Sequence, residues 1–139
     1  MSTYIPNPPP RPVNFLDEQF WAHCADGVLG FQCCDDCGSW RHIPRYMCAQ
    51  CGSDQWSWRE SSGRGVVYSW TVCYMPMSPE FDNAFPYAVL VVEMEEGVRM
   101  TAGLLGMNHD DLRLELPVEV VFEPLEGGGQ LPFFRPRNG

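Results

Sequence analysis

Four of the seven cysteines have the spacing of ligands to a single metal ion. They form two C-x-x-C-G motifs that stand ten residues apart. A two-residue gap lets both thiolates of a motif reach one tetrahedral ion, and the glycine permits the positive φ that turns backbone amides toward the sulfurs. Because four thiolates leave no open coordination position, we predict a structural zinc site with the ligands Cys34, Cys37, Cys48 and Cys51.

The other reactive side chains have no motif that would make them catalytic. Cys33 begins no C-x-x-C-G motif, and Cys24 and Cys73 lie in apolar stretches where a free cysteine serves as a small core residue. The sequence contains no G-x-S-x-G, P-loop, dinucleotide-binding or H-E-x-x-H motif. We therefore predict no catalytic residue, and we interpret the three histidines as surface or turn residues: His23, His42 and His109.

Two arginines lie between the cysteine motifs. Four thiolates around a divalent ion leave a formal charge of about −2, which charge-assisted hydrogen bonds from Arg41 and Arg45 would offset. Contact with a phosphate of coenzyme A is the alternative for both residues.

Composition limits the architecture and the partners. With 139 residues and 45% hydrophobic content, the chain can form one main domain with a small appendage. The net charge is −9, and no lysine is present. This charge disfavours non-specific binding to nucleic acid.

The cysteine usage and the hydropathy indicate a compartment. An odd number of cysteines in paired metal-binding spacing is typical of a reduced intracellular protein rather than of a disulfide framework. The first residues are polar and proline-rich, without the features of a signal peptide, and no apolar run is long enough to cross a membrane. We expect a cytoplasmic protein without a membrane segment.

The pattern of residues divides the chain into four parts. Prolines between residues 6 and 12 predict an extended arm over residues 1–13. A helical part over 14–29, a zinc ribbon over 30–60 and a β-barrel over 61–139 follow. The expected class is mainly β, with one N-terminal helix.

The helix is predicted near residues 15–25. Asn14 can cap it, and Gly27 follows its expected end. Its apolar face carries more aromatic area than a solvated helix needs. This face either packs on the ribbon or barrel of the same chain or docks on a partner through Phe15, Leu16, Phe20 and Trp21.

Five short strands are predicted after the ribbon. The segments are rich in β-branched and aromatic residues, and turn residues separate them. A small closed barrel removes the exposed edges of such a sheet, and an OB-fold is the expected form. The polar interval 107–113 falls at the connection between the third and fourth strands of that fold. The predicted strands are 66–74, 87–94, 98–105, 117–123 and 131–134.

The order of these motifs resembles a known family. Gly27–Gly30, the two cysteine motifs, the string from Ser62 to Val72, the Glu95-Glu96-Gly97 turn and the closing segment from Leu131 to Pro136 resemble the acyl-CoA-associated zinc-ribbon and OB-fold proteins with a rubredoxin-like ribbon. The family was long classed as a domain of unknown function. The similarity extends from about residue 14 to residue 136.

The resemblance implies a non-catalytic subunit. Members of the family accompany thiolases, thiolase-like aldolases of the sterol-carrier-protein type and MaoC-like hydratases, and the partner holds the catalytic residues. The implied function is support of an aldolase that cleaves a steroid or similar side-chain β-hydroxyacyl-CoA, in a dimer of heterodimers. A true thiolase or acyltransferase, or a MaoC-like hydratase, is the alternative partner.

The resemblance also implies a possible contact with the coenzyme A thioester. Arginine suits phosphate and an aromatic ring suits adenine. In strands, alternate residues face inward, so barrel core is the other interpretation of Tyr68 and Trp70. The candidate residues for coenzyme A or partner binding are Arg41, Arg45, Trp58, Arg59, Arg64, Tyr68 and Trp70.

Two other classes of function remain at this point. Ribbons and OB-folds also bind single-stranded nucleic acid, although the charge of −9 opposes this. A self-sufficient thioesterase or hydratase would need a catalytic motif that the sequence lacks.

Overall fold

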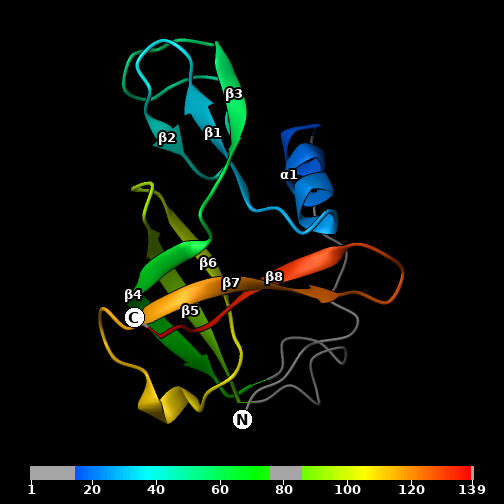
Figure 1. Cartoon of the computed structure of the whole chain (residues 1–139), viewed down its shortest axis with the longest axis vertical. Helices are drawn as coiled ribbons and strands as arrows, with labels where there is room; N and C mark the ends of the chain where they lie inside the picture. Colours follow the sequence, from blue (N-terminus) through cyan, green and yellow to red (C-terminus); the bar gives the residue numbers. More distant parts are fainter. Residues whose placement is uncertain (1–14, 76–85, 139) are drawn as a thin grey trace.

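The computed structural model describes residues 15–75 and 86–138. A three-stranded ribbon and a closed five-stranded barrel lie one above the other, and the helix α1 (Phe15–Ala25) lies beside their junction (Figure 1). Within these residues the fold is mainly β with one α-helix, as predicted. The extended arm predicted over residues 1–13 and the cap predicted at Asn14 lie outside the described residues.

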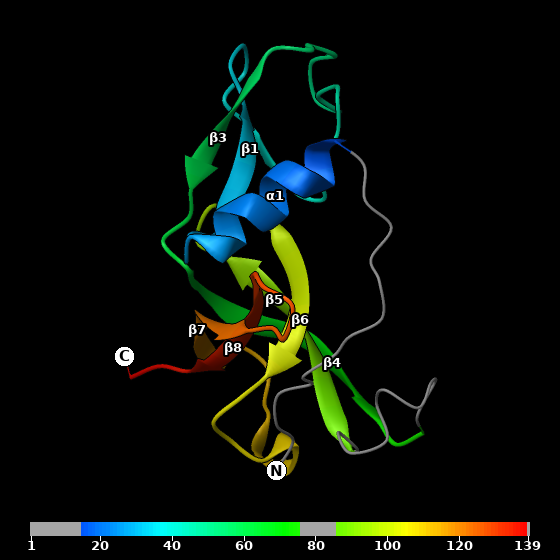
Figure 2. The same ribbon diagram turned by 90° about the vertical axis from the view of Figure 1, so that its right-hand side faces the viewer.

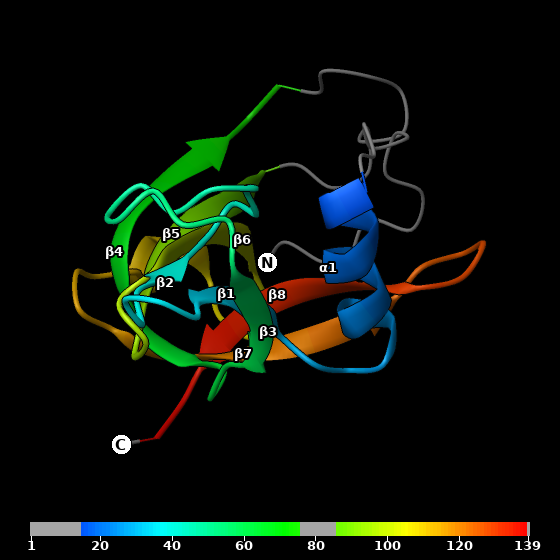
Figure 3. The same ribbon diagram turned by 90° about the horizontal axis from the view of Figure 1, so that it is seen from above.

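Helix α1 occupies the predicted range. Leu16, Phe20 and Cys24 recur every four residues and are buried on one face. The helix packs against strand β8 (Gln130–Pro136) and the ribbon strand β1 (Gly30–Cys34), as Figures 2 and 3 show from two sides. At its C-terminus, Gln130 Nε2 donates to the carbonyls of Cys24 and Ala25, at 3.2 and 3.1 Å. These bonds satisfy carbonyl groups that the helix end leaves free.

The ribbon is a short antiparallel sheet with the strand order β2-β1-β3. Strand β1 pairs with β2 (Trp40–Arg41) on one side and with β3 (Trp56–Glu60) on the other. Every residue of β1 is buried, and this includes the polar Gln32. The two cysteine motifs lie at the end of this sheet that points away from the barrel (Figure 1).

The barrel closes in the strand order β4-β5-β6-β8-β7. Strands β6 and β8 are parallel, and the other neighbouring pairs are antiparallel, which is consistent with an OB-fold. Each predicted strand is found within two residues of its expected bounds, and the helix η2 (His109–Asp111) occupies the predicted polar connection. The strands are β4 (Arg64–Cys73), β5 (Tyr87–Met94), β6 (Arg99–Leu104), β7 (Pro117–Pro124) and β8.

Strand β4 contains a β-bulge and one close backbone contact. Its pairing with β5 slips between Val67 and Ser69, so Tyr68 is an extra residue on β4. A Cβ atom on Gly65 would lie 2.5 Å from the backbone oxygen of Glu93, so only glycine fits at this crossing.

Ribbon and barrel share one core. Phe31 of β1, fully buried, and Phe20 of α1 belong to the same cluster of buried side chains as Leu90, Val92 and Phe134 of the barrel. The base of the ribbon is thus held by the barrel. The domain boundaries of the sequence analysis remain predictions.

Within the described ranges, no helix has the length and apolar character that crossing a membrane requires.

Candidate functional site

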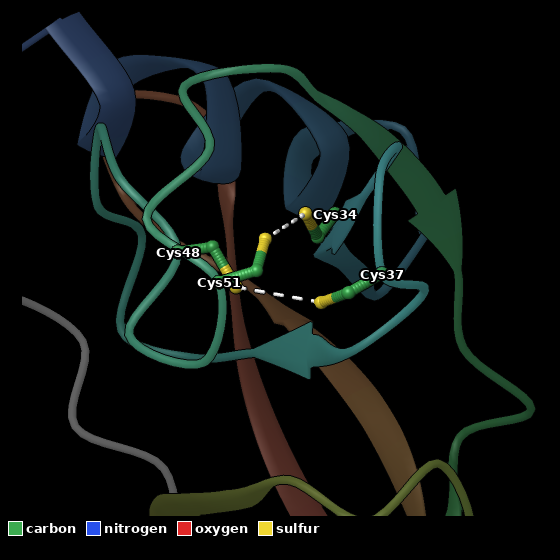
Figure 4. Close-up of side chains that lie close together, drawn as sticks. All are labelled: Cys34, Cys37, Cys48 and Cys51. Carbon is green, nitrogen blue, oxygen red and sulfur yellow. Dashed lines mark hydrogen bonds between the residues drawn. The ribbon is translucent and has the colours of Figure 1, made fainter.

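The four predicted metal ligands come together at the tip of the ribbon. Their sulfur atoms all lie within 4.8 Å of one another (Figure 4). Cys34 Sγ lies 3.6 Å from Cys51 Sγ, and Cys37 Sγ lies 3.6 Å from Cys48 Sγ. A tetrahedral ion with Zn–S bonds of about 2.3 Å requires sulfur separations of roughly 3.8 Å. The cluster therefore fits a four-coordinate zinc ion with little adjustment.

The two cysteine motifs have the same backbone geometry. In the first, Gly38 N donates to Cys34 O at 3.0 Å, and in the second Gly52 N donates to Cys48 O at 2.9 Å. Gly38 and Gly52 have φ angles of 77° and 78°, the left-handed conformation that the sequence predicted. Each motif is thus a tight turn that positions two sulfurs, and the two turns face each other.

Ser39 is part of this centre, although the spacing of cysteines did not indicate it. Its Oγ lies 3.2 Å from Cys37 Sγ and 3.3 Å from Cys48 Sγ, and its carbonyl accepts from Cys34 N at 2.8 Å. A hydroxyl that donates to a thiolate stabilises its charge. The contact with Ser39 therefore lowers the pKa of Cys37, and it is the largest cause that lowers the pKa of Cys48 to about 6.

Replacing Ser39 with alanine should weaken zinc binding by about tenfold. This is the lower end of the loss in metal affinity that is usual when a residue hydrogen-bonded to a metal ligand is removed. Because the thiol pKa values of Cys37 and Cys48 rise without the hydroxyl, protons should displace the metal at a higher pH. Competition with a chromogenic chelator over a pH series measures both effects. Ser57→Ala is the matched control, since Ser57 Oγ contacts Asp35 at 2.7 Å and no cysteine. Equal zinc affinity in both variants would contradict a role for Ser39.

The hydrogen bonds of Arg41 do not serve the predicted offset of the thiolate charge, since within the described residues they go to other groups. Arg41 donates from Nε to Gln32 Oε1 and from Nη2 to the carbonyl of Arg45, both at 2.8 Å. The backbone nitrogen of Arg45 donates to the same Gln32 oxygen at 2.8 Å. Arg41 therefore fixes the loop between the motifs through Gln32, a buried polar residue that sequence patterns did not single out.

The residues predicted to line a coenzyme A channel have different surroundings in the structure. Arg64 forms a two-pronged ion pair with Glu95, at 2.9 and 3.0 Å. Tyr68 projects outward at the bulge and is 47% exposed, whereas Trp70 packs against the barrel core. The core interpretation thus holds for Trp70 and is wrong for Tyr68.

The two remaining channel residues lie on β3. The indole Nε1 of Trp58 donates to Gln19 Oε1 of α1 at 2.6 Å, and its ring packs edge-on against His23. Trp58 therefore helps to hold the helix on the ribbon. Arg59 is exposed on the same strand.

The apolar face of α1 is mostly covered by the chain itself. Leu16 and Phe20 are 2% and 6% exposed. Of the four predicted docking residues, Phe15 is 62% exposed and Trp21 is partly exposed. A partner can therefore reach only these two without unpacking the helix.

His42 lies in a bend after β2, in keeping with the predicted surface or turn position, but it is partly buried. Its ring packs against Phe20 and Phe31, with ring centres 5.1 Å from each. Burial lowers the pKa of His42 to about 4, and nearby Asp17 opposes that shift. The imidazole is therefore neutral at pH 7.

Two adjoining hollows lie at the junction of ribbon, helix and barrel, and His42 and Arg99 line both of them. The first hollow has a volume of about 400 Å³ and is walled mostly by apolar side chains of α1, the ribbon loop and the barrel. The second has a volume of about 380 Å³ and a more polar wall that includes Arg41 and Glu93.

The sequence matches two family profiles in succession. Residues 21–57 match the profile described as ChsH2, rubredoxin-like zinc ribbon domain, and residues 58–123 match ChsH2, C-terminal OB-fold domain. A "DUF35 domain-containing scaffold protein" of Methanothermobacter thermautotrophicus is 32% identical, over 66% of this chain and 84% of the relative. The chain belongs to the DUF35 family.

Two bacterial relatives of this chain are longer proteins. A "probable enoyl-CoA hydratase alpha subunit" of Thermomonospora curvata is 37% identical over 91% of this chain and 40% of the relative. A "3-oxo-4,17-pregnadiene-20-carboxyl-CoA hydratase alpha subunit" of Mycobacterium tuberculosis is 34% identical over 81% of this chain and 35% of the relative. This DUF35 chain thus spans well under half the length of either protein.

A solved structure resembles the DUF35 chain over nearly its whole length. The structure of an Ltp2-ChsH2(DUF35) aldolase superimposes with a TM-score of 0.83 and 34% sequence identity, covering 91% of this chain and 98% of the other. The likeness therefore includes helix, ribbon and barrel together.

Proposed function

We propose that this DUF35 protein is a non-catalytic, zinc-binding accessory subunit of a heteromeric enzyme that processes acyl-CoA thioesters. The observation that carries the proposal is the likeness, over 91% of the chain, to the ChsH2 component of an aldolase complex. The archaeal relative is named a scaffold protein, which supports a role in assembly.

The metal in this proposal is a structural zinc ion. The four clustered cysteine sulfurs would complete a tetrahedral shell around the ion, which would leave no position for a substrate or an activated water. Zinc would fix the tip of the ribbon, and Cys34, Cys37, Cys48 and Cys51 would hold it. No step of the reaction is assigned to this chain.

The proposed partner is a thiolase-fold subunit that acts as an aldolase on a steroid or similar side-chain β-hydroxyacyl-CoA, in a cytoplasmic dimer of heterodimers. The matching structure is named an aldolase, and the mycobacterial relative is named for a pregnadiene carboxyl-CoA substrate. We expect the exposed Phe15 and Trp21 to contribute to the partner interface. Arg59, exposed on β3, remains a candidate for contact with coenzyme A.

A hydratase partner is the second candidate, because two relatives are named hydratase alpha subunits. This chain spans 40% and 35% of those proteins. A hydratase active site would therefore have to come from residues outside 1–139, in this or another chain. The family resemblance also supports a thiolase or an acyltransferase as an alternative partner. Nucleic-acid binding is opposed by the net charge of −9.

Co-expression with a thiolase-like protein from the same organism tests the proposal. We expect one heteromeric peak in gel filtration and lyase activity on a β-hydroxyacyl-CoA only when both chains are present. Pairing with a MaoC-like hydratase from the same organism is the matched comparison. If the thiolase-like chain purifies alone with full activity, the subunit role is wrong.

A further inference from the structure

The junction between ribbon and barrel has the features of a ligand site. The apolar hollow of about 400 Å³ falls within the range of about 300–1,000 Å³ that is usual for small-molecule pockets. Its wall includes Phe20 and Trp21 of α1 and Met100 of the barrel. The polar hollow adjoins it at His42 and Arg99 and is the shallower of the two, so an apolar pocket borders a charged, open surface.

Arg99 is a fixed cation at this boundary. Its guanidinium carbon lies 3.8 Å from the ring centre of Tyr68, which projects outward because of the bulge in β4. The aromatic face holds the guanidinium without neutralising it. Glu93 stands opposite Arg99 on β5, yet the two side chains form no ion pair.

Arg41 is a second cation of the same wall. Its hydrogen bonds go to the neutral amide of Gln32 and to a backbone carbonyl. Its Nη1 atom is buried and has no hydrogen-bond partner among the described residues. Arg64 and Arg135 instead pair with carboxylates. Within residues 15–75 and 86–138, Arg41 and Arg99 thus face one hollow without a carboxylate partner.

Few negatively charged groups line the two hollows and would repel a bound anion. Glu93 lines the polar hollow, and Asp17 lines the apolar one. His42 is neutral at pH 7, because burial lowers its pKa to about 4. Two arginines and one glutamate therefore give the polar hollow a net positive charge in a protein whose net charge is −9.

We propose that this cleft binds an amphipathic carboxylate. The apolar body of the ligand lies in the first hollow against Phe20, Trp21 and Met100, and its carboxylate lies between Arg41 and Arg99. Guanidinium groups match a carboxylate with two parallel hydrogen bonds, which gives both affinity and orientation. The site belongs to this chain alone and does not depend on the proposed role as a subunit.

A calorimetric titration of the full-length, zinc-loaded chain with octanoate tests the site. We expect saturable binding of one octanoate per chain, with shifts in the NMR signals of the Trp21 and Trp40 indole groups, which line the two hollows. Binding of 1-octanol, which has the same chain length without the charge, and of acetate, which has only the head group, should each be at least about tenfold weaker.

Variants of the arginines complete the test. Arg99→Gln should weaken octanoate binding by about tenfold or more, and Arg99→Lys, which keeps the charge but not the fork, should be intermediate. Arg113→Gln, at an exposed position outside both hollows, is the matched control and should bind as the original chain does. No saturable binding, equal binding of octanol and octanoate, or full affinity in Arg99→Gln would each overturn the proposal.

Discussion

Replacing Cys37 with serine is expected to release the metal and to unfold the tip of the ribbon while the barrel stays folded. The loop between the motifs has almost no core of its own. Ile43, Tyr46 and Met47 are 61%, 59% and 59% exposed. In zinc-finger peptides a structural zinc ion contributes about 10–16 kcal/mol to the folded state, so the metal replaces the missing core.

Two measurements check this expectation. Zinc content should fall from about one ion per chain to near zero by elemental analysis, as a single tetrahedral site requires. Amide exchange should become fast in residues 35–55 and stay slow in β5 and β7. Cys73→Ser changes a cysteine in β4 and should keep the metal. A metal-free Cys37→Ser chain with slow exchange at the tip would show that the ribbon folds by packing alone.

The metal centre and the barrel follow from local patterns in the sequence. Each cysteine motif is a turn within a few residues, so its geometry needs no information from the rest of the chain. The strands alternate, and their turns contain glycine at positive φ, as at Gly97. Element type and bounds could therefore be predicted before the structure was known.

The pairing of side chains across elements could not be predicted in the same way. Arg64 pairs with Glu95, a residue 31 positions later in the sequence, so it is engaged rather than free for a phosphate. The bulge at Tyr68 changes which residues of β4 face inward, and a one-residue slip leaves no mark in the alternation. Helix spacing likewise predicts an apolar face without showing that the chain itself covers Leu16 and Phe20.

The cleft at the ribbon–barrel junction was missed for a related reason. His42 looks like a loop residue in the sequence, but it packs against Phe20 from the helix and Phe31 from β1. Arg99 follows the turn after β5 and reaches the cleft because the ribbon lies over that turn. Contacts between the ribbon and the barrel could be predicted from pairs of positions that vary together across relatives.

Replacing Phe31 with alanine is expected to lower the free energy of unfolding by about 3–5 kcal/mol, the usual cost of removing a buried phenylalanine. Phe31 is fully buried in β1 and belongs to the core that includes Leu90 and Val92 of the barrel. Its loss would therefore release the ribbon from the barrel. Chemical unfolding followed by tryptophan fluorescence measures the change.

Phe15→Ala is the matched control, because it removes the same side chain from a position that is 62% exposed. It should change the free energy of unfolding by less than about 1 kcal/mol, as surface substitutions usually do. If Phe15 contacts the partner, this variant should weaken the heteromer without loss of stability, whereas Phe31→Ala should weaken it through the altered placement of the ribbon. Unchanged stability in Phe31→Ala would mean that ribbon and barrel fold independently. In that case, binding of a partner would not depend on a fixed orientation of the ribbon on the barrel.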